Sequence, residues 1–224
     1  MQALEIERPP RSEAELLERA SALAGRTLGE LAQALAITIP EDPRRSKGLA
    51  GRLLERALAA DAHGAPEPDF RQLGIELKSI PLDRRGRPRE STFVCSIRLA
   101  DMETAYWESS RVRRKLARVL WVPIESAPDL PLPNRRIGAA RIWSPSPEQE
   151  RILREDWETL VGHIACGEFE NLTAHRGRYL QIRPKAAHAG IRERAHDEAG
   201  APTATLPRGF YLRARFTAGL FGDS

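Results

Sequence analysis

Long apolar runs are absent from this sequence of 224 residues, of which 41% are hydrophobic and 29% carry a charge. No stretch approaches 18 apolar residues without a charge, so the sequence predicts no membrane span. Glu5, Glu7 and Arg8 lie where a secretory signal peptide needs an apolar core. We therefore expect a cytoplasmic protein with no membrane-bound part.

Cysteine is also scarce, since the chain contains only Cys95 and Cys166. Two cysteines cannot form a disulfide framework, and these two lack the spaced partners that a zinc site requires. The five histidines show no metal-ligand spacing either. These absences argue against a secreted disulfide scaffold and a structural zinc domain, and they indicate a reducing compartment.

Lysine is the third scarce residue, because only four of the 35 basic residues are lysines: Lys47, Lys78, Lys115 and Lys185. Arginine serves wherever a general surface cation is sufficient. Lysine instead offers a compact charge on a flexible stem, with a pKa that burial can shift. The four lysines are therefore candidates for positions that need this particular chemistry.

The net charge of +4 is a weak indication of a polyanionic partner. Basic residues gather in two segments of the chain. Residues 111–118 contain five basic residues and no acid, and residues 183–215 contain seven basic residues and three acids. A solvated surface explains each segment as well as a nucleic-acid contact does, so charge alone does not decide between them.

The pattern of apolar residues predicts helices first and a sheet afterwards. Capping boxes at Ser12–Glu15 and Thr27–Glu30 predict two amino-terminal helices, and a third is expected from about 47 to 60. A long helix is expected between residues 146 and 165, and residues 186–206 are expected to form a mobile loop. Strands or extended segments are predicted over 74–80, 91–99, 119–124, 136–143, 179–183 and 209–216. This is a mixed α/β (α+β) fold, with a central mixed sheet flanked by helices.

The segment from Asp69 to Lys78 is the most informative part of the chain, because Glu76 and Lys78 stand two residues apart in a predicted strand. Side chains alternate between the faces of a strand, so Glu76 and Lys78 should lie side by side, opposite Ile75 and Leu77. A half-exposed edge strand with an ion pair on one face is the simplest explanation of this pattern alone.

A catalytic interpretation of the same segment requires Asp69 to enter a neighbouring strand and approach Glu76. Two converging carboxylates repel unless a cation lies between them, and their hard oxygen atoms suit Mg²⁺. Lys78 would then orient or deprotonate an attacking water and offset charge on a phosphate, as metal-assisted phosphodiester hydrolysis requires. Glu55, on the polar side of the preceding helix, is a candidate third carboxylate, although pairing with an arginine of that helix explains it more simply.

Several long motifs follow one another along the chain. Asp69-x-x-x-Leu-Gly-Ile-Glu-Leu-Lys-Ser-Ile-Pro continues to Gly86-Arg-Pro-x-Glu-Ser-Thr-Phe-Val-Cys95. Later come Tyr179-Leu-Gln-Ile-Arg-Pro-Lys-Ala-Ala187 and Leu206-Pro-Arg-Gly-Phe-Tyr-Leu212, and Lys47-Gly48 precedes the third helix. In this order the motifs resemble the MutH family, the strand-nicking endonucleases of methyl-directed DNA mismatch repair. The resemblance covers about residues 12–220, although residues 188–206 depart from the family pattern.

The resemblance implies a restriction-endonuclease-like fold in a single endonuclease domain over residues 1–224. Two lobes would surround a DNA cleft: residues 1–105, with the amino-terminal helices and catalytic strands, and residues 106–224, with the DNA-reading part. It also implies Mg²⁺ as the cofactor and nicking of the unmethylated strand at hemimethylated GATC sites in double-stranded DNA. MutL would activate the enzyme and MutS would act indirectly, and we expect a monomer.

The resemblance also assigns catalytic roles to individual residues. Asp69, Glu76 and Lys78 match the catalytic motif, in which Asp69 and Glu76 would be the metal ligands. Glu55 matches an additional active-site carboxylate, and Lys115 matches a lysine near the scissile phosphate.

A second group of residues matches positions of the family that contact DNA: Lys47, Gly48, Arg183, Pro184, Lys185 and Tyr211. Arg183, Pro184 and Lys185 match the segment that reads GATC in the major groove. Tyr211 matches the residue linked to sensing adenine methylation. All four lysines fall at or beside positions with such roles.

Two alternatives remain open at this point. The first is a GATC-specific restriction endonuclease of the same fold, which would cut both strands without MutL. The second is a non-catalytic DNA-binding protein whose carboxylates are structural. Plasmid nicking that depends on Mg²⁺ distinguishes either enzyme from the binding protein.

Overall fold

The computed structural model describes residues 8–42, 46–62, 64–99, 102, 105–169, 172, 176–185, 192–197 and 199–221. The chain folds into two compact units whose segments alternate along the sequence. The first unit contains Met1–Arg89 and Ala117–Ser144, and the second contains Glu90–Leu116 and Pro145–Ser224. The lobes of residues 1–105 and 106–224 remain a prediction.

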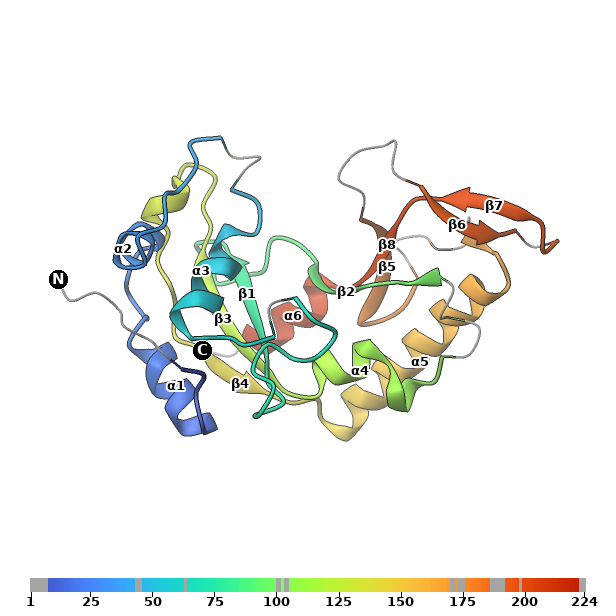
Figure 1. The fold of residues 1–224 in the computed structure, drawn as a ribbon, viewed down its shortest axis with the longest axis horizontal. Helices are drawn as coiled ribbons and strands as arrows, with labels where there is room; N and C mark the ends of the chain where they lie inside the picture. The colour runs from blue at the N-terminus through green and yellow to red at the C-terminus, as the bar shows by residue number, and fades with distance from the viewer. Residues whose placement is uncertain are drawn as a thin grey trace. The chain divides into compact units, whose positions relative to one another are not determined.

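The first unit combines helices with a small mixed sheet. Its described elements are α1 (Glu13–Ser21), α2 (Leu28–Ala34), α3 (Leu49–Ala57), β1 (Glu76–Leu82), β3 (Val119–Glu125), the 3-10 turn η3 (Leu132–Asn134) and β4 (Arg141–Trp143). The strand order is β1–β3–β4, with β1 parallel to β3 and β4 antiparallel to it. β1 is therefore an edge strand, and Figure 1 shows α3 beside it.

Both predicted capping residues lie at helix starts, but only the pair at α2 forms a complete capping box. The Ser12 side chain accepts from the Glu15 amide at the start of α1, and Thr27 and Glu30 bond reciprocally at the start of α2. The leucines that follow on these helices pack into one core with α3 and one face of β1 and β3. Ile75 and Leu77 belong to this core, which fixes the face on which β1 presents its apolar side chains.

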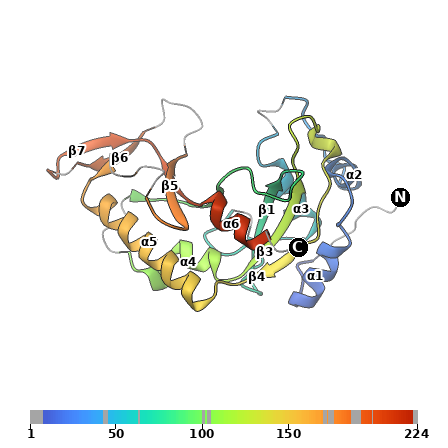
Figure 2. The same cartoon turned by 180° about the vertical axis from the view of Figure 1, so that it is seen from behind.

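The second unit is built around an antiparallel sheet with strand order β2–β8–β5. Its described elements are β2 (Thr92–Ser96), the 3-10 turn η2 (Trp107–Ser109), α4 (Arg111–Leu116), α5 (Pro147–Ala165), β5 (Leu180–Pro184), β6 (Glu193–His196), β7 (Pro202–Thr205), β8 (Arg208–Leu212) and α6 (Ala214–Phe221). The long helix α5 packs against β5, and Figure 2 shows it from behind.

The prediction of a mobile loop over residues 186–206 is wrong for residues 192–197 and 199–206, the part of this segment that the structure describes. β6 and β7 pair there as an antiparallel hairpin. The hairpin turn is specified locally. Asp197 Oδ1 accepts hydrogen bonds from the amides of Ala199 and Ala201, and Gly200 has a φ of +77°. Residues 186–191 and 198 lie outside the described residues.

Two further expectations need correction, and one basic segment has a structure that was not predicted. The predicted strand over 209–216 ends at Leu212, and α6 begins at Ala214 because the Arg213 carbonyl accepts from the amides of Phe216 and Thr217. The predicted strand over 136–143 contains only β4, since Arg136 and Ile137 form isolated bridges instead. The basic run over 111–118 includes a short helix, α4.

The predicted class of fold is confirmed: the protein is a mixed α/β structure with a mixed sheet flanked by helices. Within the described residues, no helix combines the length and apolar character needed to cross a membrane.

Candidate active site and nucleic-acid interface

Glu76 and Lys78 form a buried ion pair on β1. Only 3% of Glu76 and 8% of Lys78 are exposed, and Lys78 Nζ lies 2.8 Å from Glu76 Oε1. The predicted alternation of side chains and the ion pair on one face of an edge strand are confirmed, but the expected half-exposure of the pair is wrong because both charges are buried. A buried ion pair seldom adds stability over well-packed apolar residues of similar size. This pair therefore needs an explanation other than stability.

Asp69 lies next to this pair, although it is not part of a named strand. Phe70 and Ile75 form an isolated antiparallel bridge, and Gly74, with a φ of +64°, allows the tight turn between them. The turn brings the Asp69 carboxylate to the start of β1, where Asp69 Oδ2 accepts from the Leu77 amide at 2.9 Å. The carboxylate therefore lies beside the backbone that carries Glu76.

The carboxylates of Asp69 and Glu76 fit the ligand chemistry of Mg²⁺. Among the described residues, no group of three or more His, Cys, Asp and Glu side chains is arranged to hold a metal ion. Mg²⁺ does not need such a group, because it keeps several waters and binds through one or two carboxylates plus substrate phosphate oxygens.

Glu55 is exposed on α3, the helix beside β1. Within residues 46–62 it forms no ion pair with Arg52 or Arg56, so the simpler explanation by pairing is not supported. A methyl group added at Gly51, one turn earlier, would lie 3.8 Å from Ser79 Oγ, at an ordinary van der Waals distance. This face of α3 therefore lies next to β1.

Lys47 and Gly48 are both exposed at the start of α3. Gly48 is the N-cap residue, with a φ of +74°, and it makes no side-chain cap. The first amide groups of a helix need external partners, and they favour anions such as phosphate. A lysine beside an N-terminus without a side-chain cap is suited to the same kind of ligand.

The basic run over residues 111–118 does not behave as one surface. Lys115 is buried in the second unit, with 7% of its surface exposed. Arg113 pairs with Glu150 at 2.8 Å in the same unit. Arg118 belongs to the first unit, where it makes two hydrogen bonds of 2.6 Å to Glu13. Lys115 therefore differs in environment from its basic neighbours.

One face of the β2–β8–β5 sheet carries several of the predicted DNA-binding residues. Phe93, Tyr211 and Gln181 are neighbours across the three strands, Arg183 follows on β5, and Lys185 comes directly after the end of that strand. The alternate residues of β8 and β5 are buried on the other face: Phe210, Leu212, Leu180 and Ile182. We call the first face the polar face and define it by Phe93, Gln181, Arg183, Lys185 and Tyr211.

Close ring contacts join the side chains of the polar face. Lys185 Nζ lies 3.4 Å from the centroid of the Phe93 ring and 3.3 Å from Ser96 Oγ. The Phe93 and Tyr211 rings meet edge to face, with centroids 5.3 Å apart. Gly209 makes this possible, because a methyl group there would lie 2.9 Å from Phe93 Cε2.

The hydroxyl of Tyr211 is partly withdrawn from water. Burial raises the pKa of Tyr211, the charge of Arg183 opposes that shift, and the charge of Glu90 adds to it. The side chain is therefore a neutral phenol at neutral pH. It can present both a ring edge and a hydrogen-bonding oxygen.

Asp156 is a structural residue that the sequence analysis did not identify. It is buried on α5, and its carboxylate accepts four hydrogen bonds of 2.6–2.9 Å from the amides of Arg178, Tyr179 and Leu180. These amides lead into β5, so Asp156 fixes the start of that strand. The sequence did contain a signal for this role. Asp156 is an acidic residue four positions after Ile152, so it falls on the apolar side of the predicted helix.

Sequence analysis also missed Ser91, Phe93 and Gln181 as partners of the predicted DNA-binding residues. Gln181 is two residues before Arg183 in a predicted strand, so the alternation of faces would have identified it. Ser91 and Phe93 come from a distant part of the sequence, and only their pairing through β8 brings them to the polar face.

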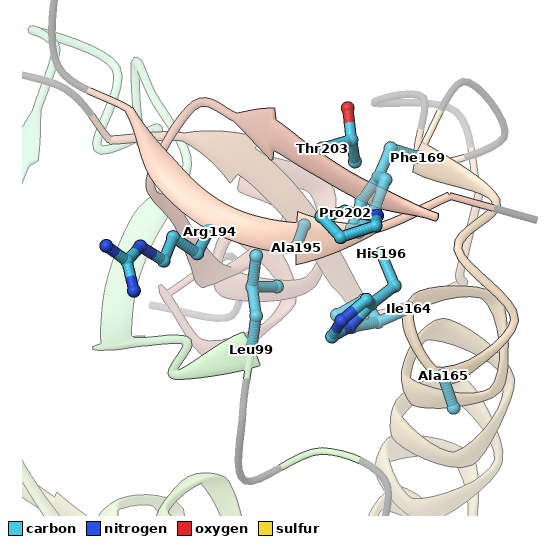
Figure 3. Close-up of a pocket in the computed structure, with 9 residues that line it drawn as sticks. All are labelled: Leu99, Ile164, Ala165, Phe169, Arg194, Ala195, His196, Pro202 and Thr203. Carbon is cyan, nitrogen blue, oxygen red and sulfur yellow. The ribbon is translucent and has the colours of Figure 1, made fainter. Parts of the chain in front are cut away.

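A cavity of about 700 Å³ lies elsewhere in the second unit. Figure 3 shows its lining, which comes from the β6–β7 hairpin, the end of α5, Leu99 and Phe169. The lining residues are Leu99, Ile164, Ala165, Phe169, Arg194, Ala195, His196, Pro202 and Thr203. None of the predicted site residues contributes to it.

Comparison with known proteins gives a consistent picture. A family model described as "DNA mismatch repair enzyme MutH" matches residues 58–156. A DNA mismatch repair protein MutH of Vibrio parahaemolyticus is 51% identical over 208 residues, which cover 93% of this chain and 92% of the relative. The proteins of the same name from Serratia proteamaculans and Escherichia coli are 51% and 50% identical over 212 residues, covering 95% of this chain and 93% of each relative.

Proposed function

This chain belongs to the MutH family of DNA mismatch repair endonucleases, and we propose that it nicks the unmethylated strand at hemimethylated GATC sites. The family has a restriction-endonuclease-like fold, with which the mixed α/β architecture agrees. Membership of the family identifies the chain as an endodeoxyribonuclease and argues against a DNA-binding protein with purely structural carboxylates.

The observation that carries the catalytic proposal is the buried pair of Glu76 and Lys78 next to Asp69. Asp69 and Glu76 would hold Mg²⁺, which supplies Lewis-acid polarisation of the phosphodiester and lowers the pKa of a bound water. Lys78 would orient the attacking water and offset the negative charge that develops on phosphate oxygens. Water then adds to phosphorus, the bond to the leaving oxygen breaks, and that oxygen takes up a proton.

Glu55 and Lys115 have supporting roles in this proposal. Glu55 is an additional carboxylate on the helix that packs against β1, where it can bind a water of the reaction centre. Lys115 is a buried lysine in a chain whose basic residues are mostly arginines, and it would contact the scissile phosphate. Both assignments come from the resemblance to the family.

Recognition of GATC is proposed for the polar face of the second unit. Arg183, on β5, and Lys185, directly after its end, are exposed cations that can donate to guanine O6 and N7 in the major groove, and Pro184 lies between them. Tyr211 would contact the adenine amino group and sense its methylation. Lys47 and Gly48 would bind a backbone phosphate at the start of α3.

We further propose that the enzyme acts as a monomer in the cytoplasm, is activated by MutL and depends on MutS indirectly. The names of the relatives favour this repair role over a restriction endonuclease of the same fold.

The decisive experiment is a nicking assay on hemimethylated GATC duplexes in Mg²⁺, with and without MutL. The proposal predicts cuts in the unmethylated strand only, at a rate that MutL increases. Cleavage of both strands without MutL would instead identify a restriction endonuclease. Fully methylated and GATC-free duplexes are the matched controls.

A further inference from the structure

The Ser91 hydroxyl is the meeting point of two side chains from β5. Ser91 Oγ accepts a hydrogen bond of 2.7 Å from Gln181 Nε2 and one of 3.1 Å from Arg183 Nη1. Ser91 directly precedes β2, which lies on the other side of β8 from β5. The two hydrogen bonds therefore span the middle strand of the sheet.

We propose that Ser91 is a positioning residue for sequence recognition, because its hydroxyl holds Arg183 in the orientation that reads a base. This inference rests on the proposed role of Arg183 in contacting GATC. Ser91 itself need not contact DNA, and it acts through the guanidinium that it binds.

The geometry explains why Arg183 needs such a partner. Arg183 is exposed on β5, and a free arginine side chain has rotamer entropy that a base contact would have to overcome. The bond to Ser91 removes part of this freedom before DNA binds. A guanidinium has five N–H donors, so one bond to Ser91 is compatible with a bidentate contact to a guanine.

Gln181 makes the arrangement more rigid. Only 5% of its surface is exposed, so its amide is held by packing as well as by Ser91. Gln181 lies opposite Tyr211 in the register of β5 and β8, and Arg183 lies 5.9 Å from the Tyr211 ring centroid. The Ser91 hydroxyl thus joins the strand of Arg183 to that of Phe93, on either side of Tyr211.

The test measures equilibrium binding to a GATC duplex and to a duplex with the same bases in scrambled order. Ca²⁺ replaces Mg²⁺ in the titration of labelled DNA, to suppress cleavage. Ser91→Ala should weaken binding to the GATC duplex by about tenfold, the usual scale for a hydrogen bond to a charged group, and leave scrambled DNA within about twofold. Ser91→Thr keeps the hydroxyl and should restore the preference. Ser109→Ala, which removes an exposed hydroxyl bonded only to the Tyr106 carbonyl, should match the unmodified protein.

A double-mutant cycle with Arg183→Ala separates positioning from a general structural effect. If Ser91 acts through Arg183, then Ser91→Ala should change GATC binding by less than about twofold in the Arg183→Ala background. A full loss in that background would overturn the inference, as would an equal loss on both duplexes or a failure of Ser91→Thr to rescue. If the unmodified protein does not prefer GATC, the proposed function itself is wrong. A normal preference that Ser91→Ala leaves unchanged refutes only the role of Ser91.

Discussion

Arg183 and Tyr211 contact each other across neighbouring strands, with the Arg183 guanidinium carbon 5.9 Å from the centroid of the Tyr211 ring. In the proposed function, one of these residues reads a base and the other senses its methylation. Their contact means that the charge of Arg183 acts on the phenol of Tyr211, so a change at one residue should be detectable at the other. This coupling can be measured without DNA.

The ionisation of Tyr211 should reveal this coupling. Burial raises the pKa of Tyr211 and Arg183 opposes the shift, so Arg183→Ala should raise that pKa further. Absorbance titration of the phenols measures it, with Tyr211→Phe assigning the signal and exposed Tyr106 as an internal reference. Because the pKa of Tyr211 is raised in the folded protein, its contribution to folding stability depends on pH. That contribution is fully present below the pKa of the unfolded state, about 10, and is lost as the pH rises through the pKa of the folded state. A Tyr211 pKa that Arg183→Ala leaves unchanged or lowers would show that the two side chains do not interact in solution.

Removal of the buried pair on β1 should abolish nicking and leave DNA binding largely intact. Glu76→Ala and Lys78→Ala each remove a group that acts at the scissile phosphate, whereas affinity comes mainly from phosphate contacts by other residues. Lys78→Arg should also be inactive, because a planar guanidinium cannot replace a compact ammonium. Nicking rates in Mg²⁺ and duplex affinity in Ca²⁺ are the measurements. Near-normal nicking by any of these variants would contradict the catalytic assignment.

Stability controls distinguish catalysis from folding in this experiment. Each single variant leaves one buried charge without its partner, which typically costs about 3–5 kcal/mol in free energy of unfolding. The double variant Glu76→Gln/Lys78→Met removes both charges and should be more stable than either single variant, yet still inactive. Urea unfolding of the three proteins tests this order.

The sequence predicted the catalytic strand more completely than the polar face. Glu76 and Lys78 are two residues apart, so strand periodicity alone places them together, and Asp69 is joined to them by a short turn. The polar face joins segments that are far apart in the sequence, such as Ser91 and Gln181, which are 90 residues apart, and no local pattern predicts that β8 lies between their strands. The β6–β7 hairpin and α6 were not predicted because their short segments show little hydrophobic periodicity. Their structure depends instead on the turn at Asp197 and on the packing of Phe216.

Lys185 should contribute to sequence discrimination, whereas Arg114 should not. Lys185 is held on the polar face by Phe93 and Ser96, and loss of a base contact typically costs about 1–3 kcal/mol of discrimination. Arg114 is an exposed residue of the 111–118 run, so Arg114→Ala should weaken binding to all DNA alike. Affinities for GATC and scrambled duplexes provide the comparison. Equal losses on both duplexes for Lys185→Ala would remove it from the reading residues.

Asp156 should matter for recognition although it lies on the helix behind β5. Asp156→Asn replaces an acceptor of four backbone hydrogen bonds with a group that has only one acceptor oxygen, so the start of β5 should become mobile. We expect a fall in thermal stability and faster amide hydrogen exchange at residues 178–182, with a smaller preference for GATC. Asp129→Asn is the matched control, since the exposed Asp129 side chain forms only a surface ion pair with Arg84. Unchanged exchange in β5 would contradict this role.

Methylation sensing by Tyr211 gives the last prediction. A methyl group on the adenine amine would meet the Tyr211 ring or displace a hydrogen bond, at a cost of about 1–3 kcal/mol per strand. Tyr211→Ser removes the obstacle and should narrow the ratio of nicking rates on unmethylated and fully methylated GATC DNA. Tyr211→Phe keeps the ring, which packs on Phe93, so it should retain the steric part of that ratio and lose only the contribution of the hydroxyl. Tyr211 is half-buried, so a purely structural role predicts a different result. Tyr211→Ser would then lower the stability of the protein and leave the ratio of nicking rates unchanged. The ratio, measured in variants shown to be folded and active, therefore separates a sensing tyrosine from one that only fills the sheet.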